Sequence, residues 1–316
     1  MSLSSVPEKS RGVVLIIVLV LFMALSGLTL MTIDVSSKGA VEAAKVRSEY
    51  EAHFLAEEAL FLIYKQLQDD KTPFSDTAKD HWARKWEGDG VWFEITPCNA
   101  KVNLNDVANI QDTKKILDIM GRILPAGTDV ERLVGSLGVW TGKKVSSTLK
   151  KIDSLFYATQ YPSYSPTGRV FVTPEEVTLV NGWRDFDREW IDENFTVWGS
   201  EGKININFAS PETLLAYFPK LSRSIKNIIH WRNTRGFTDL SQVISVAGIQ
   251  ADSELYKNML NYLSVKSDIF EARVVASVSG CRVVKRYIIS RPSTFETELP
   301  NLIFQNDVSV TFDSDQ

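Results

Sequence analysis

Four carboxylates lie close together near the middle of the chain, and such groups are the ligands that calcium prefers. They are Asp185, Asp187, Asp192 and Glu193. Hard cations such as Ca²⁺ take several oxygen ligands, but this spacing lacks the regularity of an EF-hand loop. A solvated acidic face has the same composition. The sequence therefore leaves open whether these residues hold calcium or only face water, and it indicates no other cofactor.

Only two cysteines occur, Cys98 and Cys281. In an oxidising compartment they can pair, and the chain-entropy model assigns a loop of this length roughly 5 kcal/mol of stabilisation. Two separately buried thiols are the alternative. The sequence does not indicate zinc, because zinc takes four ligands and the three histidines show no ligand spacing; these are His53, His81 and His230.

Sequence motifs of common enzyme classes are missing. The chain has no Gly-x-Ser-x-Gly, no His-Glu-x-x-His, no Walker loop and no dinucleotide fingerprint. Its net charge of -4 also counts against a dominant phosphate-binding surface, because nucleic-acid affinity depends largely on Lys and Arg. We therefore expect no catalytic residue, and a function in binding or assembly.

An uncharged apolar run from Val13 to Ile33 has the length of a membrane span. Its 21 residues give roughly 31 Å as a helix, which matches a bilayer core of about 30 Å. Lys9 and Arg11 precede it and Asp34 follows it, so we expect a single-pass protein with a cytoplasmic N-terminus and an exported body. The alternative is a secreted binding protein whose signal is cut near Ser26.

The helical pattern continues beyond this run, from 34 to 70. Apolar residues recur there at intervals of three and four among charged ones. They are Ala40, Ala43, Ala44, Tyr50, Phe54, Leu55, Ala59, Leu62, Ile63 and Leu67. The pattern predicts an amphipathic helix that covers a globular domain or a partner helix. Either one helix runs through Gly39 or two helices meet near it.

The leader and the apolar run resemble those of type IV pilins and pseudopilins. In these families a prepilin peptidase cuts after a Gly that ends a short basic leader, which implies cleavage here between Gly12 and Val13. Most members carry Glu at the fifth mature position, where this chain has Ile17. A buried carboxylate is costly unless it is paired, and its partner in these families is understood to be the N-terminal amine of a neighbouring subunit. With an apolar residue in place of this glutamate, the chain resembles the K-type minor pseudopilin of type II secretion systems, which is thought to cap the pseudopilus tip.

The predicted fold class is α+β. Residues 91–104 have strand composition, and residues 269–291 alternate as two strands joined at Ser279-Gly280. We expect a pilin-like fold in which the long N-terminal helix packs on a small antiparallel sheet. A large, mostly helical domain interrupts that sheet.

Two short segments within this helical domain look alike. Residues 101–109 and 203–212 each begin with Lys, alternate apolar residues with Asn, and then start a helix, which predicts two lobes built on one plan. The second segment opens about fifty residues that resemble a SAM-like helix-hairpin-helix unit. Its predicted core is Leu214, Leu215, Ile225, Ile228, Ile229, Phe237, Leu240, Val243 and Ile249.

Such units are used by competence-type, membrane-anchored DNA-binding proteins, and this is the alternative function. Phosphate binding at the hairpin requires glycine, which permits close approach of the backbone amides. The first hairpin, residues 218–222, contains no glycine, and Pro219 removes one donor. We therefore expect a protein-interaction lobe and no nucleic-acid partner.

The resemblance to K-type minor pseudopilins covers most of the chain, and residues 164–182 follow a family run of Pro-Tyr, Glu-Glu-Leu and Val-x-Gly. Relatives often have an acidic Trp-x-Asp run that helps to hold calcium, but this chain has Trp140-Thr141-Gly142-Lys143-Lys144 there.

The expected parts are a leader (1–12), a membrane half-helix (13–33), an amphipathic half-helix (34–70), the first part of the sheet domain (71–104), two helical lobes (105–198 and 199–265), a closing hairpin (266–292) and a C-terminal tail (293–316).

The resemblance implies a protein of the cell inner membrane with a periplasmic body, acting in pseudopilus assembly and protein export across the outer membrane. The implied partners are the I-type and J-type minor pseudopilins, bound through the N-terminal helix, and the prepilin peptidase. The secretin or an exported substrate would contact the tip.

Overall fold

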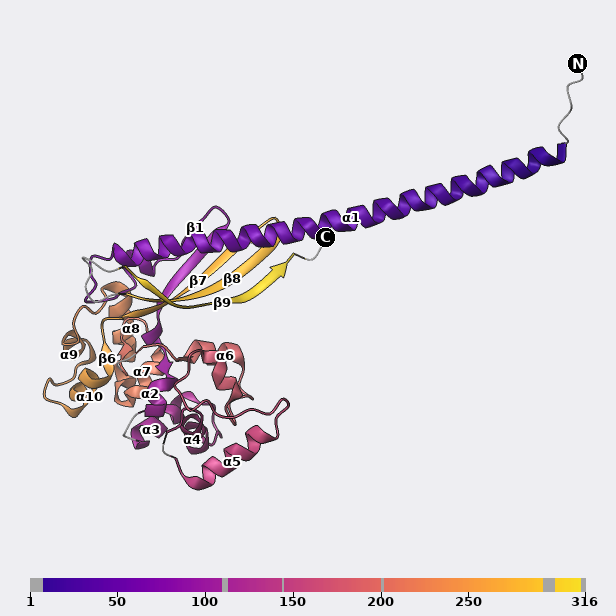
Figure 1. Cartoon of the computed structure of the whole chain (residues 1–316). Helices are drawn as coiled ribbons and strands as arrows, with labels where there is room; N and C mark the ends of the chain where they lie inside the picture. The colour runs from indigo at the N-terminus through magenta and orange to yellow at the C-terminus, as the bar shows by residue number, and fades with distance from the viewer. Residues whose placement is uncertain (1–7, 110–112, 144, 200–201, 292–298, 314–316) are drawn as a thin grey trace, which may run out of the picture.

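One continuous helix, α1 (Glu8–Gln68), forms the N-terminal part of the protein. The computed structural model describes residues 8–109, 113–143, 145–199, 202–291 and 299–313. With 61 residues α1 is about 92 Å long, and it runs through Gly39 without a break (Figure 1). Among the described residues, α1 is the one helix that is long and apolar enough to cross a membrane, by length and composition. Most of the predicted leader lies outside the described residues.

A five-stranded antiparallel sheet packs against the C-terminal half of α1, with strand order β1-β2-β7-β8-β9. The strands are β1 (Trp86–Gly88), β2 (Val91–Pro97), β7 (Ile269–Val278), β8 (Cys281–Ser290) and β9 (Asn301–Phe312). The predicted hairpin turn is confirmed: Ser279 and Gly280 have φ of 47° and 80°, as a two-residue type I′ turn requires. The predicted α+β fold is confirmed.

The C-terminal segment corrects one prediction. We expected a tail from residue 293, but residues 301–312 form strand β9, which pairs with β8 along its whole length. Leu302 packs against the core beneath α1, and Phe304 packs against the helical domain. The tail therefore supplies an edge strand to the sheet.

Small and branched side chains on one side of α1 pack on the sheet. Ala52, Ala56, Ala59, Ile63 and Leu67 are all buried, and they recur at three and four. Alanine at three of these positions lets the helix approach the strands closely. Figure 1 shows α1 crossing one face of the sheet and then extending far beyond it.

The inserted domain lies against the opposite face of the sheet and enters the chain between β2 and β7 (Figure 1). The first lobe contains β3 (Val102–Asn103), α2 (Leu104–Asn109), α3 (Thr113–Ile123), α4 (Val130–Trp140), α5 (Ser147–Ala158), the 3₁₀ helix η3 (Pro174–Leu179), α6 (Arg188–Asn194) and β4 (Phe195–Thr196). The second contains β5 (Ile204–Asn205), α7 (Pro211–Tyr217), η4 (Pro219–Arg223), α8 (Ile225–Thr234), α9 (Gln242–Ala247), α10 (Glu254–Tyr262) and β6 (Leu263–Ser264). Short 3₁₀ helices η1 (His81–Ala83) and η2 (Cys98–Ala100) flank β1 and β2.

The two lobes share one plan, as the repeated Asn segments predict. A short parallel strand pair closes each lobe, β3 with β4 and β5 with β6. Asn105 binds the main chain of Phe171, accepting from its N–H at 2.8 Å and donating to its carbonyl at 3.0 Å. Asn207 binds Phe237 in the same way, at 2.8 Å for both bonds. The Asn side chain thus ties the start of each lobe to a distant loop.

All nine predicted core residues of the second lobe belong to its hydrophobic core, four of them fully buried. The buried four are Leu214, Ile228, Phe237 and Val243, and the other five are partly buried.

Replacing Asn207 with alanine should lower the free energy of unfolding by roughly 2–4 kcal/mol. Asn207 is buried and also donates at 2.8 Å to the carbonyl of Asp76, so its loss leaves several buried main-chain groups unpaired, at about 1–3 kcal/mol each. Denaturant unfolding of the full chain in detergent micelles measures the loss. The control is Asn258→Ala, at an exposed amide that bonds only within α10, and we expect a change within about 0.5 kcal/mol there. Equal losses would contradict the role of Asn207.

Candidate assembly interface

The outward side of α1 carries a stripe of apolar side chains that no described part of the chain covers. We call Val46, Tyr50, Phe54 and Phe61 the outer stripe. These side chains are 59%, 73%, 57% and 73% exposed, respectively. Their spacing of four, four and seven keeps them on one side of the helix. Large aromatic side chains at this exposure mark a surface that binds another apolar surface.

The sequence pattern alone did not separate this stripe from the core. Tyr50 and Phe54 share the helical periodicity of Ala59, Ile63 and Leu67, but only the last three are buried. From the sequence we expect this half of α1 to cover either a globular domain or a partner helix. The structure shows that one side of α1 covers the sheet, while the opposite side, which carries the outer stripe, is exposed.

The N-terminal part of α1 is exposed on all sides. Residues from Val13 to Ile33 extend beyond the body, and among the described residues nothing outside α1 lies within 4 Å of the Cβ position at Gly12. Ile17 is 53% exposed, so the residue at the predicted fifth mature position is accessible on the surface of the helix. The residues expected at the processing junction thus lie on an accessible, isolated helix.

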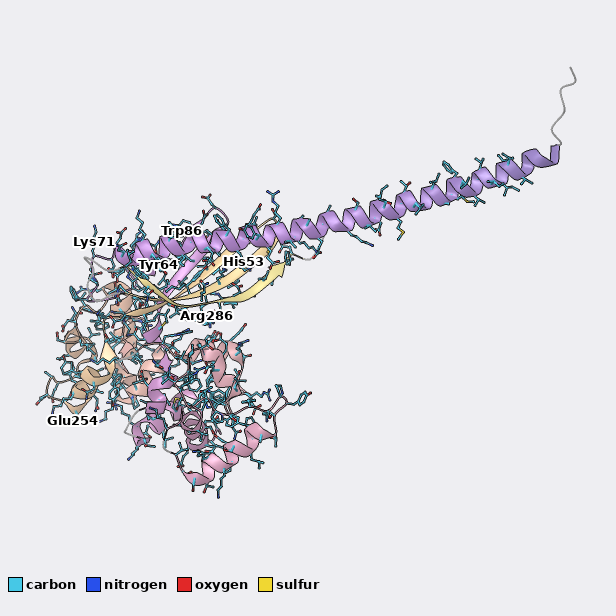
Figure 2. All side chains as sticks on the ribbon, in the orientation of Figure 1. His53, Tyr64, Lys71, Trp86, Glu254 and Arg286 are labelled. Atoms are coloured by element: carbon cyan, nitrogen blue, oxygen red, sulfur yellow. The ribbon has the colours of Figure 1, made fainter. Side chains whose placement is uncertain are left out.

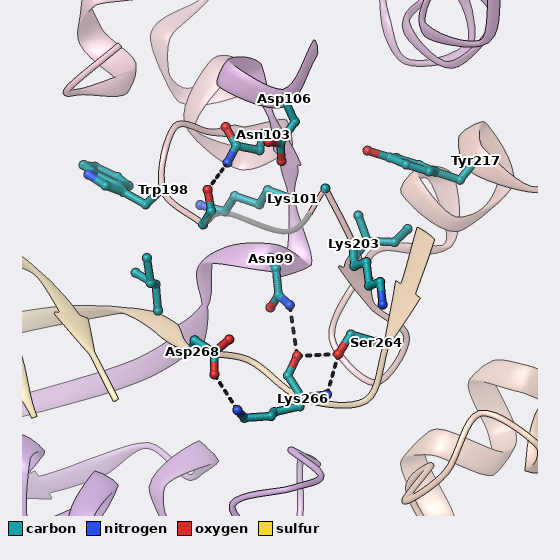
Figure 3. A pocket seen from close by; sticks show the side chains of 14 residues that line it. Asn99, Lys101, Asn103, Asp106, Trp198, Lys203, Tyr217, Ser264, Lys266 and Asp268 are labelled. Carbon is teal, nitrogen blue, oxygen red and sulfur yellow. Dashed lines mark hydrogen bonds and ion pairs between the residues drawn. The ribbon is translucent and has the colours of Figure 1, made fainter. Parts of the chain in front are cut away.

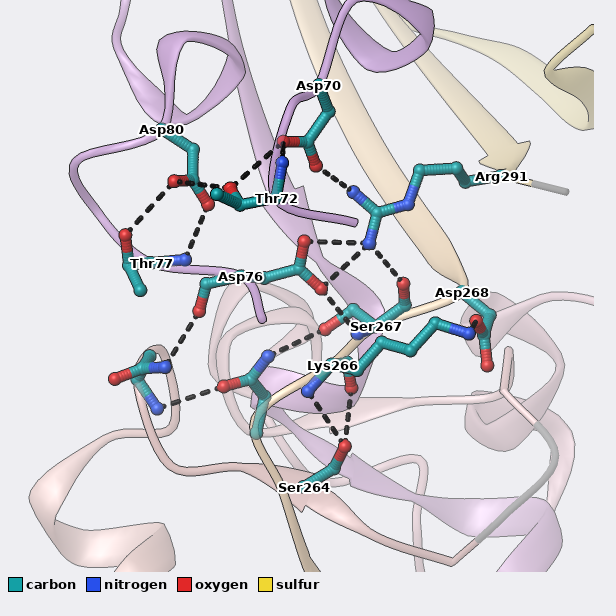
Figure 4. Close-up of polar contacts among 12 residues, drawn as sticks. Asp70, Thr72, Asp76, Thr77, Asp80, Ser264, Lys266, Ser267, Asp268 and Arg291 are labelled. Carbon is teal, nitrogen blue, oxygen red and sulfur yellow. Dashed lines mark hydrogen bonds and ion pairs between the residues drawn. The ribbon is translucent and has the colours of Figure 1, made fainter. Parts of the chain in front are cut away.

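A buried ion cluster fixes the C-terminal end of α1 to the body (Figure 4). Arg291, just after β8, donates to Asp70 at 2.6 Å and to the two carboxylate oxygens of Asp76 at 2.7 and 2.9 Å. It also donates to the carbonyl of Ser267 at 2.8 Å. Burial raises the pKa of Asp76 to about 7, and the guanidinium of Arg291 opposes that rise. The cluster connects the end of α1, the loop after it and the segment before β7.

A second ion cluster joins the sheet to the first lobe. Arg286 of β8 donates to Glu175 at 3.0 Å and to Asp192 at 2.5 Å, and it lies 3.1 Å from Glu271 of β7. Burial lowers the pKa of Arg286, but the three carboxylates outweigh this effect and raise it overall. The inserted domain is therefore held to the sheet by a charge network centred on one arginine.

The four candidate calcium ligands are not brought together. Asp192 pairs with Arg286, and Asp187 caps α6 by accepting from the N–H of Trp190 at 3.0 Å. Asp185 and Glu193 are exposed. Within the described residues, no group of three or more His, Cys, Asp or Glu side chains is arranged to hold a metal ion. Two of the four acids therefore have structural roles instead.

Of the two alternatives left open for the cysteines, the structure agrees with separate thiols and shows no disulfide between them. Both thiols are free and buried. Cys98 follows Pro97, which pairs with Phe270, whereas Cys281 pairs with Val278. Eight positions of β7 separate these partners, a distance of about 27 Å, far beyond the reach of a disulfide. Burial raises the pKa of both thiols.

A small polar hollow lies where the two lobes meet the sheet (Figure 3). Its volume is about 90 Å³, well below the roughly 300–1,000 Å³ of typical ligand sites. Asn99 donates to the carbonyl of Lys266 at 3.1 Å, and the Lys266 ammonium lies 2.8 Å from Asp268. Several polar groups that line the hollow thus bind one another, as in a structural junction between elements.

A long N-terminal helix, packed by its C-terminal half on an antiparallel sheet and preceded by an exposed apolar run, is typical of the pilin-like class of folds. No protein-family model and no curated protein sequence matches the chain. Among solved structures, it is similar to a chain of "The Crystal Structure of the GspK-GspI-GspJ complex from enterotoxigenic Escherichia coli Type 2 Secretion System", with a TM-score of 0.60 and 17% identity over 87% of this chain and 99% of that chain. The predicted resemblance to a K-type minor pseudopilin is confirmed at the level of the fold.

Proposed function

We propose that this protein is the tip subunit of a type II secretion pseudopilus, acting in pseudopilus assembly and in protein export across the outer membrane. The observation that carries the proposal is the asymmetry of the molecule. α1 is exposed and apolar over its N-terminal half, while the inserted domain makes the opposite end broad (Figure 1). Helices of neighbouring subunits can pack along α1 from below. The breadth of the body obstructs a further subunit above it.

The proposed partners are the I-type and J-type minor pseudopilins, which would contact α1. A solved structure with this fold is a chain of a complex whose name joins GspK, GspI and GspJ. Figure 2 shows the side chains that project from α1 on all sides beyond the body. The body would lie in the periplasm, with the N-terminus in the cytoplasm, α1 in the inner membrane and the inserted domain towards the secretin or an exported substrate.

Ile17 supports the place at the tip. A glutamate at that position would need a cationic partner, because an unpaired carboxylate in lipid or in a filament core is costly. An apolar side chain removes this requirement. It fits a subunit that lies beneath no other subunit.

N-terminal sequencing of the mature chain tests the proposal. We expect the protein to begin at Val13 when it is produced together with a prepilin peptidase, because cleavage would follow Gly12. The control is the same chain produced without that peptidase, which should keep its leader. A mature chain that begins near Gly27 in both cases would instead show an ordinary secretory signal and contradict the pseudopilin proposal.

The competence-type DNA-binding alternative gains no support from the second lobe. Its first hairpin is the 3₁₀ helix η4, which begins at Pro219 and contains no glycine. Gly248 ends α9 with φ of 65°, the conformation of an ordinary helix C-cap.

A further inference from the structure

The sheet has one blunted edge and one open edge. β1, at the first edge, is three residues long, whereas β9, at the other, has twelve. Among the described residues, no strand pairs with the outer side of β9. A long edge strand presents a row of main-chain donors and acceptors to any extended segment that approaches it.

The register shows which main-chain groups of β9 face outward. The N–H of Asp313 donates to the carbonyl of Gly280 at 2.8 Å, so this residue bonds inward, toward β8. In an antiparallel ladder, inward-bonding and outward-facing residues alternate. Phe312 pairs with Cys281 and Val310 with Val283, both at the outward-facing positions. Their N–H and C=O groups therefore point to the open edge.

The side chains at these two positions form an apolar surface beside α1. Val310 and Phe312 are 36% and 40% exposed. Residues directly opposite in a ladder share a face, and their partners Val283 and Cys281 belong to the core beneath α1. The open edge thus combines free main-chain groups with apolar side chains. Residues 301–312 contain no Lys, Arg or Pro, which commonly protect an edge strand from pairing.

The surroundings of this edge are acidic. Asp307 is 52% exposed, and Glu49 and Glu57 of α1 are 41% and 43% exposed. Lys285 is 11% exposed, pairs with Glu57 and lies 3.8 Å from Asp307, and the His53 ring lies 3.9 Å from Asp307. The three carboxylates stay partly exposed beside these cationic partners. A second copy of this chain, placed edge to edge, would bring two acidic surfaces together. The charge therefore selects against self-pairing and favours a basic occupant.

We infer that the outer edge of β9 binds an extended segment of a partner protein in which apolar and basic residues alternate. The segment adds a sixth strand to the sheet. The main chain of the partner segment forms hydrogen bonds with the main chain of Val310 and Phe312, and its apolar side chains contact those of the same two residues. Its basic side chains lie near Asp307, Glu49 and Glu57. This binding does not depend on a place at the pseudopilus tip.

The probe for this site is a short fluorescent peptide in which valine alternates with lysine, added to the full chain in detergent micelles. We expect saturable binding by anisotropy, and slower hydrogen exchange at residues 308–312 when the peptide is present. A peptide with glutamate in place of lysine should not bind, because the edge is acidic. Absence of exchange protection in the wild-type chain, or equal binding of both peptides, would overturn the inference.

Proline at position 310 separates main-chain from side-chain recognition. Val310→Pro removes an outward N–H and no bond to β8, so the sheet should persist while affinity falls on the order of tenfold. The matched variant Val310→Ala keeps the amide, and its affinity should stay within about threefold. The inference fails if both variants bind like the wild type. It also fails if the unliganded chain forms a dimer that Val310→Pro dissociates, because β9 would then bind a second copy.

Discussion

Replacing Arg291 with methionine should lower the free energy of unfolding by roughly 3–5 kcal/mol, the range found when one partner of a buried ion pair is removed. The Asp70 and Asp76 side chains are 3% and 0% exposed, and Arg291 supplies the positive charge that both contact. Methionine has a volume similar to that of arginine, so the decrease in the free energy of unfolding measures the loss of the charge and of its hydrogen bonds. Denaturant unfolding of the full chain in detergent micelles at pH 8, followed by tryptophan fluorescence, measures it.

The pH dependence identifies which carboxylate causes the loss. Burial raises the pKa of Asp76 to about 7 in the folded protein, so folding favours its protonated form, and the contribution of Asp76 to stability rises as pH falls from 7 toward 4. Arg291 lowers the pKa of Asp76, and its removal raises that pKa further. The Arg291→Met protein should therefore regain more stability than the wild type when the pH is lowered from 8 to 5.

An exposed ion pair provides the control. Lys257 and Glu254 of α10 are 3.1 Å apart, with side chains 61% and 81% exposed. Lys257→Ala should change the free energy of unfolding by no more than about 1 kcal/mol, because solvent screens such pairs. If Arg291→Met costs as little as Lys257→Ala, the cluster does not hold the end of α1.

The parts of the fold that depend on local pattern could be predicted from the sequence. The apolar run and the amphipathic period predicted α1, and the alternation around Ser279-Gly280 predicted the β7–β8 hairpin. Strand composition over residues 91–104 predicted β2, which occupies the first part of that range and ends at Pro97, since proline cannot donate to a ladder. The repeated Asn segments predicted the two lobes. In each lobe one of these Asn side chains binds the main chain of a phenylalanine in the same lobe.

The parts that depend on distant contacts could not be predicted. Asp76 and Arg291 are 215 positions apart, and neither has neighbours in the sequence that suggest a pair. β9 alternates only partly, and its role appears only when β8 is in place. A helical period also cannot say which apolar side of a helix meets the body, so it does not separate Tyr50 and Phe54 from the buried Ala59 and Ile63.

The double variant Phe54→Glu and Phe61→Glu should abolish binding of the I-type and J-type partners while leaving the fold intact. Both side chains belong to the outer stripe and are 57% and 73% exposed, so the isolated chain loses little packing when they change. In a helix bundle the same positions would bury two unpaired carboxylates, each at a cost of several kcal/mol. Affinity should then fall by on the order of a hundredfold or more, since about 1.4 kcal/mol is a factor of ten.

Co-purification of the full chain with both partners in detergent measures this effect, and thermal unfolding of the chain alone checks the fold. Phe74→Glu is the matched control, because Phe74 is 78% exposed but lies outside α1. If added negative charge weakens binding in general, the double variant and the Phe74→Glu variant should both bind more weakly. If the interface lies on α1, only the double variant should lose binding. Retention of both partners by the stripe variant, with loss in the Phe74→Glu protein, would place the assembly surface on the body and remove α1 from the proposed mechanism.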